Sequence, residues 1–314
     1  MKRAILGACL LLFLPVMIFA QAKVGTSQAQ FLEIGPGARS SGMAGAFLGV
    51  ADDITAIYYN PAGLARLTGA EFGAGYLKYP AGINYSYAAA AYPAFGGVIG
   101  SAFYNLGTDK MPVRNPSHPE GTGQTFSAND MACGMTYSRM LTDRFSVGIT
   151  AKFIGEFYED ETAYGWAVDI GTFYQTQFKS LRLGMMLSNF GPDMKFIEQS
   201  YPIPMAFQFG MAAEVLQDAN NRLTLSLLGL HPNDNLEKFG FGVEYAFREY
   251  AFLRAGYRLT GYSFKDIDKY NSEGFSFGGG ISVPVAMRKV CLDYAYTDFG
   301  SLTSLHRVSF GFKF

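Results

Sequence analysis

The chain has 314 residues and a formal net charge of −1 at pH 7, and only 16% of its residues are charged, against about 25% in an ordinary soluble domain. The sequence has no basic patch, so we expect no nucleic-acid partner. Hydrophobic residues make up 49% of the chain and aromatic residues 16%, and there are 37 glycines. This combination is typical of a transmembrane β-barrel rather than of a soluble β-sandwich.

Residues 1–22 are predicted to be a secretory signal peptide. Lys2 and Arg3 precede an apolar run over residues 4–19. The run is followed by Ala20-Gln21-Ala22, the small-x-small pattern that signal peptidase prefers. No later stretch reaches the roughly 18 apolar residues that a transmembrane helix needs.

Residues 23–68 are predicted to form an N-terminal hatch segment, in which residues 23–30 are expected to be a flexible lead. Residues 31–67 are Gly- and Ala-rich and differ from the strand-like remainder of the chain. We expect a small N-terminal hatch of short helices and turns in the lumen of a barrel. Ser40 or Ser41 is predicted to cap a short helix through Val50, because a side-chain oxygen there can accept from free N–H groups. The alternative is a terminal strand followed by a loop.

Asp52 and Asp53 are adjacent acidic residues in the hatch segment. Asp53 is predicted to cap a second helix, which ends at Tyr59. A paired-carboxylate or calcium site is the alternative, but further oxygen ligands at regular spacing are missing.

The hatch segment ends in an Asn60-Pro61-Ala62-Gly63 motif. Pro61 is expected to force Asn60 out of helical geometry, and Gly63 to supply a turn.

Residues 69–314 alternate between apolar and polar positions and are predicted to form an antiparallel outer-membrane barrel of about 14 strands. Most candidates are near the ~9–11 residues that a tilted transmembrane strand needs. The candidate strands are 70–79, 82–92, 95–105, 128–140, 144–155, 163–175, 180–190, 203–215, 221–230, 238–247, 250–260, 273–283, 289–296 and 305–314.

The connections between candidate strands alternate between short and long. Even-numbered connections are tight, and odd-numbered ones are mostly longer, as at 107–127, 156–162, 191–202 and 261–272; the first, at 80–81, is an exception. Because outer-membrane barrels have short periplasmic turns and long external loops, we expect both termini on the periplasmic side.

Charged residues in the strands identify the lumen-facing positions, since a charge facing lipid costs roughly 2–4 kcal/mol at the bilayer midplane. In the last strand, Val308 and Phe310 are expected to face lipid, and Arg307 and Ser309 to face the lumen. The last five strands carry the expected lumen network, which comprises Glu244, Arg254, Arg258, Asp293 and Arg307. The network either braces the hatch, with Arg39 pairing with Asp293 or Glu244, or holds the anionic head group of a ligand or a partner peptide.

No catalytic or metal-binding motif is found, so we expect neither an enzyme nor a cofactor. His118, His231 and His306 stand alone, and there is no HExxH, CxxC or GxSxG motif. Cys133 and Cys291 are expected to be separate thiols rather than a disulfide.

Several motifs, in order along the chain, resemble the PorV/PorQ family of bacterial outer-membrane proteins, distant relatives of the FadL-type transporters. The matching residues in the hatch include Arg39, Asp52, Asp53, Asn60, Pro61 and Gly63. Those in the barrel lie in Leu253 to Arg258, Leu292 to Tyr296 and His306 to Ser309. The resemblance covers most of the mature chain and favours the hatch over a terminal strand.

Two functions are implied by the resemblance. PorV/PorQ-like proteins imply a platform or shuttle for proteins exported by a type IX-like secretion system, with secretion components and exported surface proteins as partners; the polar, Pro-rich 107–127 loop suits such a surface. FadL-like proteins imply a channel for uptake or export of hydrophobic small molecules, with a lipid-like ligand in the lumen. The platform is the main hypothesis and the channel the alternative; a non-specific porin is disfavoured, because a hatch obstructs the lumen.

Overall fold

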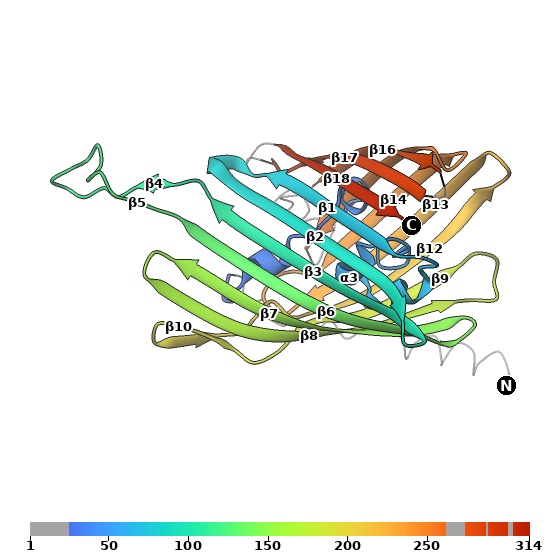
Figure 1. Ribbon diagram of the computed structural model, residues 1–314, viewed down its shortest axis with the longest axis horizontal. Helices are drawn as coiled ribbons and strands as arrows, with labels where there is room; N and C mark the ends of the chain where they lie inside the picture. The colour runs from blue at the N-terminus through green and yellow to red at the C-terminus, as the bar shows by residue number, and fades with distance from the viewer. Residues whose placement is uncertain (1–24, 262–273, 287, 301–303) are drawn as a thin grey trace, which may run out of the picture.

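The computed structural model describes residues 25–261, 274–286, 288–300 and 304–314. Its main feature is a closed antiparallel barrel of 14 strands (Figure 1). Around the barrel the strands follow the order β1-β18-β17-β16-β15-β14-β13-β12-β9-β8-β7-β6-β3-β2. The predicted signal peptide, residues 1–22, lies outside the described residues. No helix in the described parts of the chain is long and apolar enough to cross a membrane.

The barrel strands are β1 Glu71–Lys78, β2 Ile83–Ala94, β3 Gly97–Thr108, β6 Ala128–Thr142, β7 Phe145–Tyr158, β8 Glu161–Gln175, β9 Arg182–Phe190, β12 Ala206–Gln217, β13 Asn221–Pro232, β14 Lys238–Phe247, β15 Ala251–Thr260, β16 Phe275–Val285, β17 Arg288–Asp298 and β18 Ser304–Lys313. Each overlaps one predicted strand, so the predicted fold class is confirmed. β1 pairs with both β2 and β18, which closes the barrel.

The strands form because apolar and polar side chains alternate along them, and this alternation divides the two faces of the barrel. In β18, Val308 and Phe310 are exposed on the outer face while Ser309 is buried inside. In β14, Phe241 lies outside and Glu244 inside. The outer face is therefore an apolar belt, and charged residues in the middle of the strands lie in the interior, whereas outward charges such as Lys78 and Arg139 lie near strand ends.

Short and long connections lie at opposite ends of the barrel. The turn at 95–96 is tight, with positive φ at both residues, as a two-residue hairpin requires. At the other end, the 109–127 connection contains the hairpin β4 Met111–Pro112 and β5 Thr125–Phe126, which projects well beyond the barrel in Figure 1. The 191–205 connection contains a second hairpin, β10 Met194–Phe196 and β11 Gln199–Tyr201.

One predicted long loop is wrong. Residues 156–162 were expected to form an acidic loop, but β7 continues to Tyr158 and β8 begins at Glu161. Glu156 is buried inside the barrel and accepts a hydrogen bond from the backbone of Ala29 at 3.0 Å. The acidic residues therefore extend the strands instead of ending them. The short 79–82 connection, which holds the 3₁₀ helix η3 Pro80–Gly82, is the exception that was expected.

The described ends of the chain lie at opposite ends of the barrel. The backbone N–H of Gln28 donates to Pro202 at the long-loop end, at 2.9 Å. The backbone N–H of Phe314 donates to Ala70 at the short-turn end, also at 2.9 Å. The expectation that both termini share one end therefore does not hold for the described residues.

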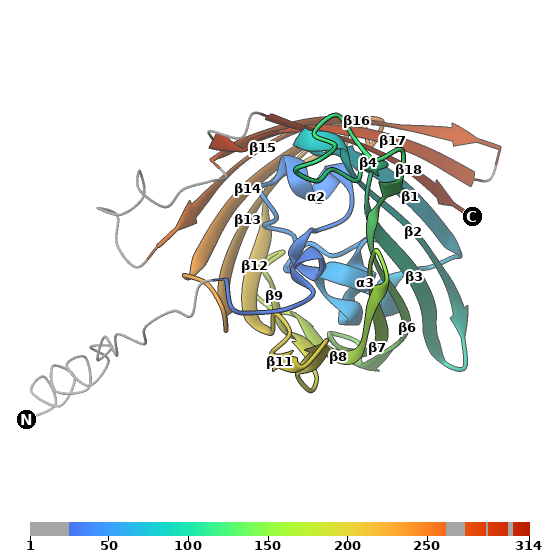
Figure 2. The same cartoon turned by 90° about the vertical axis from the view of Figure 1, so that its left-hand side faces the viewer.

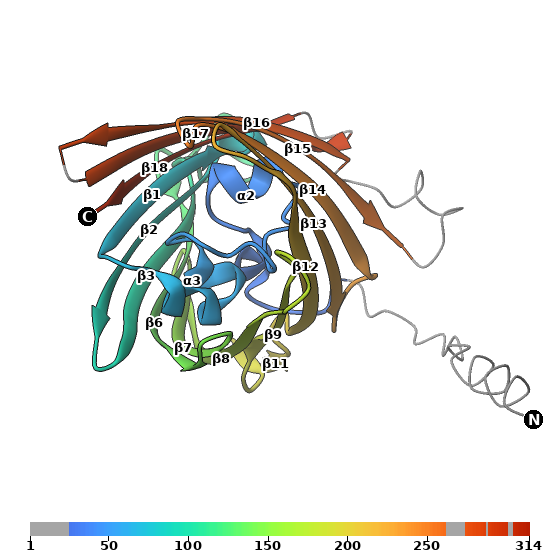
Figure 3. The ribbon, with the colours of Figure 1, turned by 90° about the vertical axis from the view of Figure 1, so that its right-hand side faces the viewer.

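The N-terminal segment fills the middle of the barrel, as both end-on views show (Figures 2 and 3). It contains η1 Gln30–Glu33, α2 Ala38–Gly42, α3 Ala56–Tyr59 and η2 Pro61–Arg66. We call residues 30–67 the hatch. α2 packs against β15 to β18, whereas η2 packs against β3 and β6 to β8. The hatch thus bridges opposite walls of the barrel.

The predicted helix caps are partly wrong. α2 starts after Gly37 and ends at Gly42, so Ser40 and Ser41 lie inside it and donate their hydroxyls to the carbonyl of Gly37. The helix stops before Val50 because Ala44 and Gly45 both adopt positive φ, which ends helical geometry.

The second predicted helix starts later than expected. α3 begins at Ala56, after Thr55, which makes no side-chain cap. Asp53 still accepts from a free backbone N–H, that of Thr55, at 2.9 Å. Asp53 therefore accepts a backbone hydrogen bond of the predicted kind, but it does so in the turn that precedes α3.

Glycines in the barrel wall allow the hatch backbone to come very close. A Cβ on Gly256 of β15 would lie 2.4 Å from the carbonyl carbon of Met43, and one on Gly148 of β7 would lie 2.4 Å from that of Pro61. The corresponding Cβ on Gly278 of β16 would lie 3.2 Å from the Cα of Gly42. Side chains at these positions would push the hatch inward. The expectation that glycines near 278–280 let the hatch approach the wall is thus met at Gly278.

The lipid-facing belt can be tested on one strand. Val308, near the middle of β18, and Ser304, at its loop end, lie on the same outward face. We expect Val308→Arg to cost ~2–4 kcal/mol of insertion free energy and Ser304→Arg only ~0–1 kcal/mol, because the cost of a charge falls toward the interface. The measurement is the yield of folded, heat-modifiable protein in lipid vesicles. Equal yields would contradict the assigned belt.

The fit of the hatch can be tested with two neighbouring glycines. Gly256→Ala is expected to displace the hatch at a cost of about 1–3 kcal/mol, because its Cβ meets backbone that cannot move independently. Gly279→Ala is the matched control, since its Cβ would lie 3.7 Å from the nearest atom, the oxygen of Phe252. The hydrogen-exchange rate of residues 38–48 should rise in Gly256→Ala but not in Gly279→Ala. Unchanged exchange in Gly256→Ala would contradict the prediction, because it would mean that β15 moves and the hatch does not.

Candidate functional site

The hatch leaves two internal cavities, one toward each end of the barrel. The loop-side cavity has a volume of about 250 Å³ and lies toward the long-loop end. The turn-side cavity has a volume of about 170 Å³ and lies toward the short-turn end. Arg39 and the acidic residues Asp52 and Asp53 line the second, whereas Ser41 and Tyr59 line the first.

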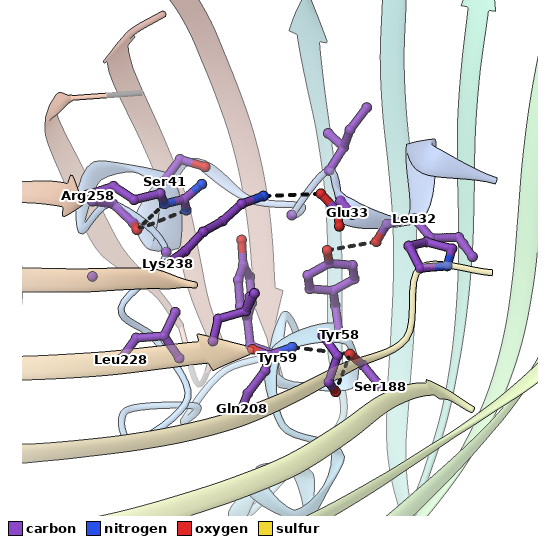
Figure 4. Close-up of a pocket in the computed structure, with 18 of the residues that line it drawn as sticks. Leu32, Glu33, Ser41, Tyr58, Tyr59, Ser188, Gln208, Leu228, Lys238 and Arg258 are labelled. Carbon is purple, nitrogen blue, oxygen red and sulfur yellow. Dashed lines mark hydrogen bonds and ion pairs between the residues drawn. The ribbon is translucent and has the colours of Figure 1, made fainter. Parts of the chain in front are cut away.

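Four side chains hold the hatch segment that passes the loop-side cavity, residues 32–36. The hydroxyls of Tyr58, Tyr85 and Tyr59 donate to the carbonyls of residues 32, 34 and 36, at 2.9, 2.9 and 3.1 Å. Arg307 donates to the carbonyl of residue 35. Because the segment belongs to no sheet, these side chains supply the partners that its backbone needs. Figure 4 shows the bond from Tyr58 beside the cavity.

The walls of the loop-side cavity are partly apolar. The larger aliphatic residues and the methionine that line it are Leu32 and Ile34 of the hatch segment, Met186 of β9, Leu228 and Leu230 of β13, and Leu305 of β18. Tyr58 also lines the cavity; its ring lies near the centre of the close-up, with Leu228 to its left (Figure 4). A ligand in this cavity would therefore contact aliphatic and aromatic surface.

Polar and charged groups complete the lining of the loop-side cavity. Lys152 and Asp169 form an ion pair at 2.8 Å, and Lys238 pairs with Glu33 of the hatch at 3.2 Å (Figure 4). Arg258 donates to the carbonyl of Ala44 at 2.9 Å. A cavity lined by both kinds of group suits an amphipathic molecule better than a pure hydrocarbon.

An ion network lies on the turn side of the hatch and is centred on Glu244, whose side chain is fully buried. Glu244 accepts two hydrogen bonds from Arg39 of the hatch, both at 2.8 Å, and one from Arg254 at 2.7 Å. Arg254 also donates to Asp293 at 2.6 Å. Arg39 reaches Asp53 at 2.8 Å as well. Each buried charge thus has an opposite partner, which is the condition for burying it.

The structure brings together only part of the predicted lumen network. Glu244, Arg254 and Asp293 are in contact, and Arg39 joins them through Glu244, as one of its two expected pairings. Arg258 and Arg307 instead line the loop-side cavity.

One member of the ion network was missed from the sequence. Arg222 of β13 lies 3.5 Å from Glu244 and 2.7 Å from Glu249. Arg222 occupies the same inward face of β13 as Thr224 and Ser226, which are buried. That alternation is visible in the sequence and could have identified Arg222.

The Asn60-Pro61-Ala62-Gly63 motif is completely buried and connects the hatch to the wall. Asn60 adopts extended geometry, as expected before Pro61, and its side chain accepts from the N–H of Ala62 at 3.2 Å. Its amide donates to the carbonyls of Leu48 at 3.3 Å and Thr172 at 3.0 Å. Gly63 lies in η2, where a Cβ would sit 2.2 Å from the oxygen of Ala51. The motif therefore acts through packing and backbone bonding.

Asp52 contributes to the hatch as an anion. Burial raises the pKa of Asp52, but the charge and hydrogen bond of Arg39, at 2.5 Å, together with the charge of Lys313, outweigh burial, so the pKa of this carboxyl lies below its ordinary value. The pair therefore stabilises the hatch above the unfolded carboxyl pKa of about 3.9, and this stabilisation is lost as the pH falls through the lower folded pKa. Because about 35% of the Asp52 side chain is exposed, water weakens the effect.

The described residues form neither a metal-binding group nor a disulfide. Across them, no group of three or more His, Cys, Asp or Glu is placed to hold a metal ion. Cys133 and Cys291 are both free thiols.

No protein-family model matches the sequence, and no curated protein matches it significantly. Solved structures do resemble it in fold. The toluene transporter TbuX of Ralstonia pickettii has a TM-score of 0.57 at 14% identity, over 88% of this chain and 97% of that chain. The monoaromatic hydrocarbon channel CymD has a TM-score of 0.59 at 12% identity, over 88% and 96%. A FadL homologue of Pseudomonas aeruginosa has a TM-score of 0.53 at 11% identity, over 94% and 99%.

These likenesses concern the fold, which is that of the FadL-like outer-membrane barrels. They do not test the resemblance to the PorV/PorQ family, which stays an expectation from the sequence motifs.

The ion network predicts a large difference between two glutamates that contact the same arginine. Glu244→Gln should cost about 3–5 kcal/mol of barrel stability, because it removes the one fully buried carboxylate that Arg39, Arg254 and Arg222 share. Glu249→Gln, the control, should cost only ~0–1 kcal/mol, since Glu249 is about half exposed, at 53%. Urea unfolding of the protein in vesicles measures both; similar costs would contradict the central place of Glu244.

Proposed function

We propose that this protein is a FadL-like outer-membrane channel that binds small hydrophobic or amphipathic molecules in the loop-side cavity and passes them across the membrane past the hatch. The observation that carries the proposal is the partly apolar cavity beside the hatch, enclosed by a barrel with an apolar outer belt. The toluene transporter TbuX and the channel CymD, which share the fold, add support.

The size of the cavity supports a small ligand. An engineered apolar cavity of ~150 Å³ is enough to bind benzene. The loop-side cavity, at about 250 Å³, therefore has room for a molecule somewhat larger than one aromatic ring.

In the proposed orientation the long loops are external and the short turns periplasmic. The loop-side cavity then faces the outside, and the ion network lies on the periplasmic side. In this arrangement Arg39, Glu244, Arg254 and Asp293 brace the hatch, and a ligand that leaves the cavity for the periplasm must displace hatch residues that they hold.

A platform for exported proteins, as PorV/PorQ-like proteins imply, is the second candidate. The projecting β4–β5 hairpin favours it, because residues 114–120, between its strands, are exposed and mostly polar, and the hairpin extends beyond the barrel (Figure 1). Its partners would be secretion components and exported surface proteins. Deletion of 111–126 should then abolish their co-purification and leave ligand binding intact.

The channel proposal is tested with a series of straight-chain alcohols of increasing length. Affinity for the purified protein, measured by calorimetry in detergent, should rise about fourfold per methylene until the cavity is full, since each buried methylene contributes about 0.8 kcal/mol. Leu228→Trp, which fills the cavity, should abolish binding and uptake of the alcohols by expressing cells.

The matched control is Leu227→Trp, because Leu227 is the adjacent residue of β13 and faces outward. If Leu228→Trp binds and takes up the alcohols as well as Leu227→Trp, the loop-side cavity is not their site and the proposal fails.

A further inference from the structure

Arg307 is a cavity-lining cation that has no carboxylate partner among the residues that the structure describes. It projects inward from β18 and is partly buried. Its Nη1 donates to the carbonyl of Gly35 and to the hydroxyl of Ser41, while its Nε is buried and meets no hydrogen-bond acceptor in the described parts of the chain. Two neutral acceptors therefore bind a group that carries a full positive charge.

Several other cationic side chains inside the barrel do have carboxylate partners. Lys152 and Lys238, which line the same cavity, have carboxylate partners at 2.8 and 3.2 Å. Arg39 and Arg254 on the turn side share Glu244. A buried charge without a counter-charge is costly, so its persistence at a cavity calls for a partner from outside the chain.

The rest of the cavity limits what that partner can be. Leu228 and Leu230 of β13, with Leu32 and Ile34 of the hatch, supply apolar surface in the same cavity as Arg307. At about 250 Å³, the space exceeds the ~150 Å³ that holds benzene by enough for one further polar group, but it is too small for a long chain.

We infer that the loop-side cavity selects a small amphipathic monoanion, about the size of an aromatic ring with one carboxylate, whose head group pairs with Arg307. The inference rests on the proposed function and adds the chemical class of the ligand. A guanidinium presents N–H groups in a planar fork that matches a carboxylate, so the pairing gives orientation as well as charge.

The pairing also connects ligand binding to the hatch. Arg307 already binds Gly35 and Ser41, which both belong to the hatch. An anion beside Arg307 competes with these two acceptors. Binding of the anion therefore weakens the attachment of the hatch to β18 at the point where the ligand sits.

The test compares benzoate with benzamide, which has nearly the same shape but no charge. In calorimetry on the purified full-length protein in detergent, the wild type should prefer benzoate. Arg307→Gln should lower the affinity for benzoate about tenfold or more and change that for benzamide less than about twofold, because a hydrogen bond to a charged group is lost. Arg307→Lys, which keeps the charge, should retain part of the preference.

Arg248→Gln is the matched control, the same change in the exposed 248–250 turn, where Arg248 donates to Asn220 at 2.9 Å. It should leave both affinities unchanged. Hydrogen exchange of residues 32–36 in Arg307→Gln shows whether the substitution displaces the hatch segment. Unchanged exchange there means that a lower affinity for benzoate comes from the lost charge. Arg307→Lys, which keeps the charge, tests the charge alone.

The outcomes separate the two proposals. If wild type and Arg307→Gln bind both probes equally well, the ligand is not selected by charge and the inference is overturned, while the cavity remains a binding site. If neither probe and no alcohol binds, both proposals are overturned. Selective loss of benzoate in Arg307→Gln, with the preference partly kept in Arg307→Lys, supports both.

Discussion

The close fit between the hatch and the barrel wall is the constraint on which the rest of the structure depends. Gly256 and Gly148, on different sides of the barrel, allow backbone-to-backbone approach. Arg39 then connects the hatch to Glu244 of the wall. The hatch lies across the lumen at this level, and the described residues leave a cavity on each side of it. A channel built on this fold must therefore move part of the hatch, or pass its ligand around it.

The two sides of the hatch differ in their electrostatics. On the turn side, Arg39, Arg254 and Arg222 share Glu244, so the network satisfies itself and suits a bracing role. On the loop side, the acceptors that Arg307 reaches among the described residues are neutral, and apolar surface lies next to them. The sequence placed both sets of charges in one network, because alternation reveals the inward face but not the height at which each residue meets the hatch.

Alternation was enough to find every barrel strand, since one face must suit lipid and the other the lumen. It failed where inward polar residues looked like a loop, as at Glu156, which is buried and bound to the start of the hatch. Helix limits in the hatch were also missed. They are set by positive φ at Ala44 and by contact with the wall, and neither is visible in local sequence. The pairing of Arg39 with Glu244 was one of two that the sequence suggested, the other being with Asp293, because a charge inside the barrel needs an opposite partner.

The central claim is that the loop-side cavity holds a small ligand. Native mass spectrometry of the full-length protein, purified from outer membranes in mild detergent, tests it most directly. The account predicts one small amphipathic molecule per chain, released on mild activation while the barrel stays folded. An empty cavity, together with a stoichiometric protein partner bound through the β4–β5 hairpin, would contradict it and favour the platform.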